Sequence, residues 1–205
     1  MAARLPKPAM VVPALVVGLL VAGAWAMLHE PRARWVGEPA PAAPVQTRDE
    51  LPPAFGYEGY VITPLARYAL TAVVLARAHY RLDRGAALGP IDLALGWGPM
   101  SRAEVINGLS ISQSGRWYEY SWPDEPPLDP GLIALNSANT HCLPDPKVRK
   151  ALFAVGRHDL VSLEGYLVEV TGEDEFRWTS STTRDDTGGG ACEVVWLTSV
   201  RRKRL

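Results

Sequence analysis

The stretch LVSLEGYLVEV, residues 160–170, decides the fold class of this chain. Two alternating sets of apolar positions run along it, out of phase with each other: Val161 and Leu163, then Tyr166, Val168 and Val170. Gly165 lies where the phase changes. A period of two that slips by one residue at a glycine is typical of a β-bulge or a barrel corner. One long strand of this kind takes part in two sides of a small closed sheet.

Other stretches also favour strands. RYALTAVVLARAHYRL (67–82) fits the periods of a strand and of a helix, but its threonine, valines and tyrosines favour a strand. In GRWYEYSW (115–122), one face carries an arginine and three aromatic residues: Arg116, Tyr118, Tyr120 and Trp122. These patterns predict a domain in which strands dominate.

Two short helices are expected within this domain. Residues 101–108 begin with the capping-box pair Ser101 and Glu104 and end at a glycine. Residues 145–156 place Asp145 as N-cap and a proline at the first helical position. The pattern of PIDLALGW (90–97) also allows one further turn of helix. The sequence therefore predicts a β-rich α+β domain, an OB-like or half-open β-barrel with two short helices.

The N-terminal segment predicts export. AMVVPALVVGLLVAGAWAML (9–28) has no charged residue and is long enough, as a helix, to cross a bilayer. Arg4 and Lys7 precede it, which favours a cytoplasmic N-terminus and a periplasmic body. A cleaved signal peptide is the alternative, because Ala24 and Ala26 have the spacing of a cleavage site. We expect residues 1–29 to be a transmembrane helix, or else a signal peptide.

The rest of the chain divides by composition. Residues 30–54 contain six prolines and several alanines, which favours an extended linker between membrane and domain. We expect the periplasmic domain over residues 55–200, followed by a short basic tail, RRKRL, at 201–205. The formal net charge is −1, so the chain has no net positive charge that would attract nucleic acid.

The two cysteines, Cys142 and Cys192, both follow the apolar segment. In an oxidising compartment this number is compatible with one disulfide between them. Two free buried thiols are the first alternative. A reactive cysteine is the second, and it requires a positioned base. His141 precedes Cys142 directly, and in a strand its side chain points the other way.

A polar loop near the C-terminus offers candidate site residues. In TSSTTRDDTGGGACEVVW (179–196), the segments on either side read as strands, so RDDTGGG is expected to be a hairpin turn or loop connection. The functional alternative uses Ser180 or Ser181 as nucleophile. Asp185 or Asp186 then acts as acid, base or ligand, and Arg184 binds an anion. No nucleophile-elbow or phosphate-loop motif accompanies these residues.

Histidines and tryptophans add few further candidates. The four histidines lack metal-ligand spacing, so neither a metal nor another cofactor is expected. His141, in the polar stretch NSANTHCLP (136–144), is either a hydrogen-bonded loop residue or a general base. Trp97 and the other aromatic residues are core residues or platforms for sugars or bases.

Five motifs together resemble a group of uncharacterised, membrane-anchored proteins of the Gram-negative bacterial envelope. They are YVITPLARY (60–68), DLALGWGPMS (92–101), ISQSGRWY (111–118), GYLVEV (165–170) and SSTTRDDTGGGACEVVW (180–196). The resemblance spans most of residues 57–199 and implies an envelope protein with one small domain. It implies no activity, cofactor or catalytic residue.

These observations favour a periplasmic binding domain, anchored in the inner membrane, for a protein, peptide or glycan partner. Its expected contact residues are Arg184, Asp186, His141, Arg116 and Trp97. The alternative is an envelope hydrolase that uses His141 with Ser181 or Asp186, which requires these side chains to converge. A third hypothesis, an OB-type nucleic-acid binder, requires a basic groove that the charge balance does not suggest.

Overall fold

The computed structural model describes residues 32–173, 175–183 and 192–205. The expected anchor or signal peptide and the loop residues Arg184, Asp185 and Asp186 lie outside these ranges. In the described ranges, no helix has the length and apolarity needed to cross a membrane. One compact unit begins at Ala33 and runs to the C-terminus.

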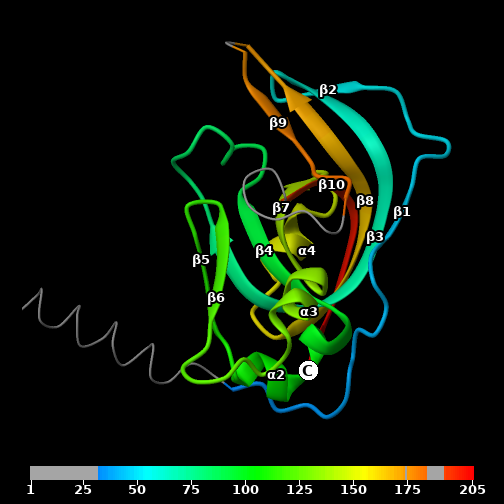
Figure 1. Ribbon diagram of the computed structural model, residues 1–205. Helices are drawn as coiled ribbons and strands as arrows, with labels where there is room; N and C mark the ends of the chain where they lie inside the picture. The colour runs from blue at the N-terminus through cyan, green and yellow to red at the C-terminus, as the bar shows by residue number, and fades with distance from the viewer. Residues whose placement is uncertain (1–31, 174, 184–191) are drawn as a thin grey trace, which may run out of the picture. The chain divides into compact units, whose positions relative to one another are not determined.

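The described chain is β-rich with a few short helices, as expected. The strands are β1 (Val45–Thr47), β2 (Phe55–Tyr57), β3 (Tyr60–His79), β4 (Ile91–Gly96), β5 (Ser110–Ser114), β6 (Trp117–Ser121), β7 (Ser137–Pro144), β8 (Asp159–Thr171), β9 (Arg177–Thr179) and β10 (Glu193–Arg204). The helices are the 3-10 helix Gly98–Ser101, α2 (Ala103–Asn107), α3 (Pro130–Leu135) and α4 (Arg149–Phe153). Figure 1 shows β5 and β6 as a hairpin beside β4.

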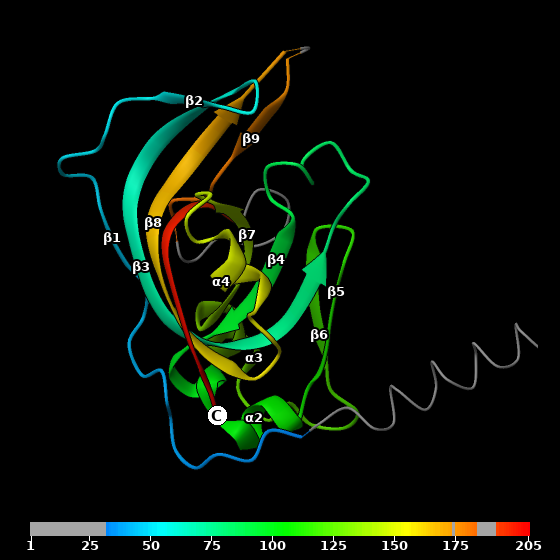
Figure 2. The same ribbon diagram turned by 180° about the vertical axis from the view of Figure 1, so that it is seen from behind.

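The main sheet closes partly on itself. Its pairings run from β3 to β4, β7, β10 and β8, and β8 pairs again with β3. All these pairs are antiparallel except β7 with β10. The long strand β3 pairs with β8 through residues 61–73 and with β4 through residues 73–79. Figure 2 shows how strongly this strand curves between the two pairings.

A first core lies inside the ring of strands. All five strands of the ring and α4 contribute to it, with members such as Val74, Leu93, Cys142, Leu163 and Leu197. A second core packs the β5–β6 hairpin, through Ile111 and partly buried Tyr118 and Tyr120, against the outer side of β3 and β4. This confirms the alternation expected for residues 115–122.

The bulge expected at Gly165 does not lie in β8, whose side chains alternate without a break. Val161, Leu163 and Leu167 pack in the first core, whereas Tyr166, Val168 and Val170 pack on the opposite face. The skipped residues lie in the partner strands. Pairing with β8 skips one residue of β3 between Pro64 and Ala66, and one residue of β10 between Leu197 and Ser199. Gly165 itself pairs with Leu197, and a Cβ there would collide with the backbone of Trp196. The glycine is required by this close approach of two backbones.

The helices differ in detail from expectation. The stretch 90–97 contains no helical turn, since residues 91–96 form the fully buried strand β4. Helix α2 begins after Arg102, and the expected capping box is not formed. The Ser101 hydroxyl donates instead to the Gly98 carbonyl and accepts from the amide of Ala40. Helix α4 is shorter than the stretch 145–156, and α3, capped by Asp129, was not expected.

Residues 33–54 lie against the domain, which differs from the expected extended linker. The Trp35 indole donates to the Ser101 carbonyl, and Ala40 is buried. Strand β1 in this segment pairs with residues 67–69 of β3. A proline-rich chain has few amide donors, but its remaining donors and acceptors find partners on the domain surface. The basic tail also belongs to the sheet, because residues 201–204 pair with 159–162 of β8.

Candidate functional site

A pair of buried ionisable residues lies on the outer face of β4 and β7. Ile91, Leu93 and Leu95 of β4 point into the first core, so Asp92 between them points outward. The strand register places Asp92 directly opposite His141 of β7. His141 Nδ1 lies 2.9 Å from Asp92 Oδ2, and the two side chains are 5% and 0% exposed.

Arg116 reaches the same carboxylate from the tip of the β5–β6 hairpin. Gly115 and Arg116 both have positive φ, 56° and 70°, as a two-residue type I′ turn requires. Arg116 Nη1 donates to Asp92 Oδ1 at 2.6 Å and to the Gly89 carbonyl at 2.8 Å, while Nη2 donates to Asp83 Oδ1 at 2.9 Å. Since arginine is unfavourable at this φ, these contacts hold it there.

Two aromatic rings enclose the guanidinium. The Arg116 guanidinium carbon lies 3.9 Å from the centre of the Tyr80 ring and 5.3 Å from that of Trp178. The Trp178 ring also lies 4.8 Å from the His141 ring. A Cβ added at Gly85 or Gly89 would come within 2.9 or 3.2 Å of Trp178, so both glycines make room for the indole.

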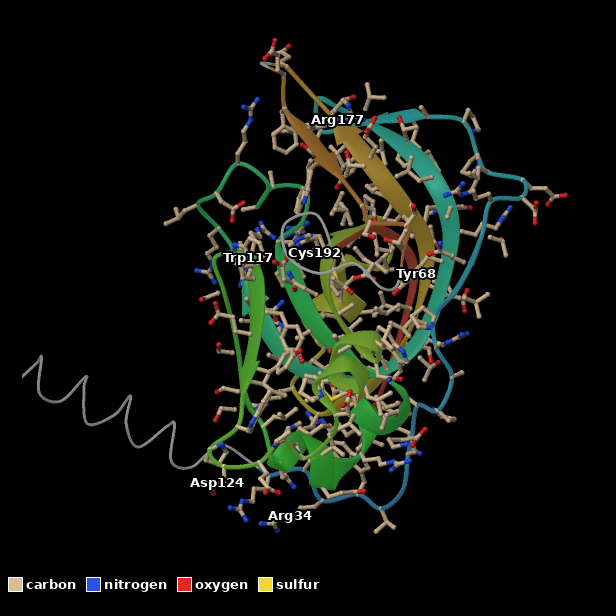
Figure 3. All side chains as sticks on the ribbon, viewed as in Figure 1. Arg34, Tyr68, Trp117, Asp124, Arg177 and Cys192 are labelled. Atoms are coloured by element: carbon tan, nitrogen blue, oxygen red, sulfur yellow. The ribbon has the colours of Figure 1, made fainter. Side chains whose placement is uncertain are left out.

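Cys192 completes the cluster at the start of β10. Asn139, two residues before His141, donates through Nδ2 to the Arg116 carbonyl at 2.8 Å and to the Cys192 sulfur at 3.4 Å. His141 lies on the same face of β7 as Asn139, and the nearby Cys192 helps to raise the pKa of His141. The amide of Ser181 donates to the Cys192 carbonyl, which joins the two ends of the loop 182–191. Figure 3 labels Cys192 there, and Trp117 at the end of the hairpin.

The surroundings of His141 favour its protonated form. Burial alone would lower the pKa of His141, but hydrogen bonds to Asp92 and Cys192, and the charge of Asp92, outweigh burial and raise the pKa to about 9. The site therefore holds two cations, His141 and Arg116, around the Asp92 carboxylate, with Asp83 at its edge. A protonated imidazole beside a carboxylate is able to give its proton to a group that contacts it.

The structure brings some of the expected site residues together. His141 and Arg116 share Asp92, although the sequence had given no reason to pair them. Trp97 is 2% exposed in the first core, so the expectation that it contacts a ligand is wrong. The Ser181 hydroxyl contacts Thr183, and no contact with His141 is seen. Arg184 and Asp186 lie outside the described residues.

The expected Cys142–Cys192 disulfide is not formed, and both cysteines are free. The physical reason is the alternation of side chains along β7. Asn139 and His141 point outward to Cys192, whereas Cys142 points into the first core. Burial raises the pKa of the Cys142 thiol well above its ordinary value. The strands around the loop also form no hairpin, since β9 and the start of β10 pair in succession with β8.

Sequence reasoning missed five members of this cluster: Tyr80, Asp83, Asp92, Asn139 and Trp178. One signal was available for Asp92, because it is the only charged residue of the apolar stretch 90–97. A buried strand retains a carboxylate only where it is paired. Among the described residues, no group of three or more histidine, cysteine, aspartate or glutamate side chains suits a metal ion.

Comparisons of this chain with protein-family models, with curated proteins and with solved structures found no match.

Proposed function

We propose that this chain is a membrane-anchored envelope protein whose periplasmic domain is an OB-like barrel that binds a peptide or glycan partner. The pairings support the barrel. Numbered along the chain, the ring strands β3, β4, β7, β8 and β10 are neighbours in the order 1-2-3-5-4-1. Five antiparallel strands in a Greek-key ring, with one parallel contact, are the arrangement of an OB-fold.

The polar cluster lies where OB-folds bind their ligands, and this observation carries the proposal. OB-folds bind oligosaccharides and oligonucleotides on their second and third strands and on the loops after the first and fourth. In this chain Asp92 and His141 lie on the second and third strands. Asp83 lies in the first of these connections, and the second, between β8 and β10, contains Trp178 in the short strand β9 and Cys192.

The hairpin tip supplies an exposed contact beside this cluster. Trp117 follows Arg116 and its side chain is 50% exposed. Exposed tryptophan next to buried polar groups is typical of sites for sugars and peptides. Asp92, Asp83 and Gly89 accept hydrogen bonds from the Arg116 guanidinium, so the exposed Trp117 ring, rather than a free guanidinium, is the expected contact for the ligand.

The proposed location rests on the apolar segment 9–28 with its basic N-terminal flank, and on the resemblance to envelope proteins. A ligand of the periplasm that carries both sugar and peptide groups is a muropeptide, so muropeptides are a suitable probe.

The test is a titration of the full chain, in detergent micelles, with soluble muropeptides. We expect Trp117→Ala to weaken binding by about tenfold or more. Leu135→Ala is the matched control, because Leu135 is 48% exposed on α3 and Trp117 50% on β6. His141→Gln and Arg116→Ala are expected to weaken binding as well. Wild-type chain that binds no muropeptide, or equal affinity in all variants, contradicts the proposal.

The nucleic-acid alternative has less support at this face. Asp83 and Asp92 both pair with Arg116, so the guanidinium charge is neutralised where a phosphate backbone would lie. We expect no binding of single-stranded DNA at low salt. The hydrolase alternative, in which His141 acts with Ser181 or Asp186, gains one specific observation, since Asp92 lies 2.9 Å from His141 Nδ1 and can orient the imidazole.

A further inference from the structure

A thiol, an imidazole and a carboxylate are connected in one line at the proposed binding face. Asp92 Oδ2 lies 2.9 Å from His141 Nδ1, and the Cys192 sulfur lies 3.4 Å from Nδ2 of Asn139, which is two residues before His141 on the same face of β7. Because Nδ1 faces the carboxylate, Nε2 is the ring nitrogen left for the sulfur. A nucleophile, a base that contacts it and a group that orients the base form the constellation of covalent acyl-transfer sites.

A different part of the sheet positions each of the three side chains, Asp92, His141 and Cys192. Asp92 and His141 are direct partners in the β4–β7 register, and Val194, two residues after Cys192, pairs with His141 in the parallel β7–β10 register. Asn139 fixes the sulfur through its Nδ2 donor. Three strands of the closed ring therefore set the positions of the three groups, which is the rigid support that covalent catalysis requires.

Solvent exposure increases from Asp92 through His141 to Cys192, so the nucleophile is the most accessible of the three groups. Asp92 is fully buried, His141 is 4% exposed, and Cys192 is half-buried. A molecule in solvent therefore meets the sulfur first. The other thiol, Cys142, is fully buried in the first core and serves as an internal comparison.

We infer that Cys192 is the nucleophile of an acyl-transfer site for esters or amides, with His141 as general acid and base and Asp92 as the positioning residue. This inference rests on the proposed binding face and assigns it a reaction. The nucleophilic form of a cysteine is the thiolate, and an adjacent protonated histidine favours that form. The Asp92 carboxylate, 2.9 Å from His141 Nδ1, favours the protonated histidine that this requires.

The reaction balances with water as the co-reactant. The Cys192 thiolate forms a bond to the acyl carbon, and the bond from that carbon to the leaving oxygen or nitrogen breaks. The leaving group takes the proton of the His141 imidazolium. Water then adds to the thioester and gives a proton to His141, the carbon–sulfur bond breaks, and a carboxylic acid leaves. Thiolate and imidazolium are restored.

The experiment uses the full chain in detergent micelles with p-nitrophenyl acetate, an activated ester. We expect release of p-nitrophenol, and an acetyl group on Cys192 in the intact mass after acid quenching. Cys192→Ala abolishes both signals, whereas Cys142→Ala keeps them. His141→Gln lowers the acylation rate by about 10²–10⁴-fold. Asp92→Asn moves the pH dependence of acylation, which a purely structural role of Asp92 would leave unchanged.

Alkylation by iodoacetamide at neutral pH is the second measurement. Cys192 is expected to react about tenfold faster in wild type than in His141→Gln, with thermal melts confirming that the variants fold. Persistent ester turnover in Cys192→Ala overturns the inference, as does rapid alkylation of Cys192 without an acetyl adduct. Muropeptide binding by Cys192→Ala separates the two proposals, because retained binding leaves the binding function intact whatever the fate of the acyl chemistry.

Discussion

Arg116 Nη1 lies 2.6 Å from Asp92 Oδ1, although the two residues are 24 positions apart in the chain. The contact joins the tip of the β5–β6 hairpin to the centre of the face formed by β4 and β7. Asp92 is completely buried, and it also supports His141. The hairpin and the histidine are therefore linked through one carboxylate, and the stability of both depends on it.

Arg116→Ala removes a partner from a buried carboxylate. We expect a loss of about 1–3 kcal/mol in the free energy of unfolding, because the buried Asp92 Oδ1 loses its hydrogen-bond donor while His141 still faces Oδ2. Chemical denaturation measures it. Arg116→Gly should cost about 1 kcal/mol less than alanine, since glycine tolerates the φ of 70° at this position.

A matched surface pair controls for the loss of an arginine. Arg102 contacts Glu38 with side chains 45% and 25% exposed, so Arg102→Ala is expected to cost less than about 1 kcal/mol. Equal losses for Arg102→Ala and Arg116→Ala would contradict a special role for the hairpin contact.

The elevated pKa of His141 predicts a pH-dependent stability. The folded chain holds the His141 proton up to about pH 9, while the unfolded chain releases it near 6.5. The stabilisation is therefore complete below about pH 6.5 and is lost as the pH rises toward 9. It amounts to at most about 3 kcal/mol. The groups that contact the imidazole are Asp92 and Cys192, with the Trp178 ring beside them.

Thermal melts over this pH range test the prediction. The wild-type melting temperature should fall between pH 6.5 and 9, and His141→Gln should show a flatter profile. A wild-type profile that rises over the same range would show that His141 is neutral when folded.

The sequence predicted the class of fold because its signals are local. Alternation in residues 115–122 reflects packing that this strand repeats along its own length. The apparent phase change at Gly165 arises because the second half of β8 packs against apolar residues on both of its faces. The sequence misassigned residues 90–97, because a strand buried on both faces lacks alternation and resembles a short apolar helix. The packing of residues 33–54 was also missed, since composition does not reveal a surface formed by distant parts of the chain.

The site was less predictable than the fold. His141 and Arg116 were identified as candidates, but the residue that joins them, Asp92, depends on the β4–β7 register and on a hairpin turn. Neither is visible in one sequence. The disulfide was expected from the number of cysteines and an oxidising compartment, whereas in the structure both thiols are free and lie on opposite faces of the sheet.

The two thiols should differ in accessibility. Cys192 is expected to be alkylated in the folded chain without reductant, and Cys142 only after unfolding, because Cys142 is fully buried. Mass spectrometry of peptides from the labelled chain distinguishes them. If neither thiol reacts after unfolding until reductant is added, the two are bonded to each other in the cell.

The intact mass of the chain isolated from membranes tests the proposed anchor. A full-length mass, with the domain degraded by protease added to the periplasmic side, is expected from a single N-terminal helix with the body exported. A mass that begins near Met27 would show that residues 1–26 are a cleaved signal peptide. Complete protection from periplasmic protease, with susceptibility after lysis, would contradict export.

Gly165→Ala tests the irregular region of the sheet. A Cβ at Gly165 would overlap the carbonyl of Trp196, and the obstacle is backbone that cannot move without separating β8 from β10. We expect a loss of at least about 3 kcal/mol, or failure to fold. Gly56→Ala in β2 is the control, because its nearest atom is the Tyr60 carbonyl oxygen at 4.0 Å. Its stability should stay within about 1 kcal/mol of wild type. If the two alanine variants were equally stable, the close approach of Gly165 to Trp196 would not exist in solution.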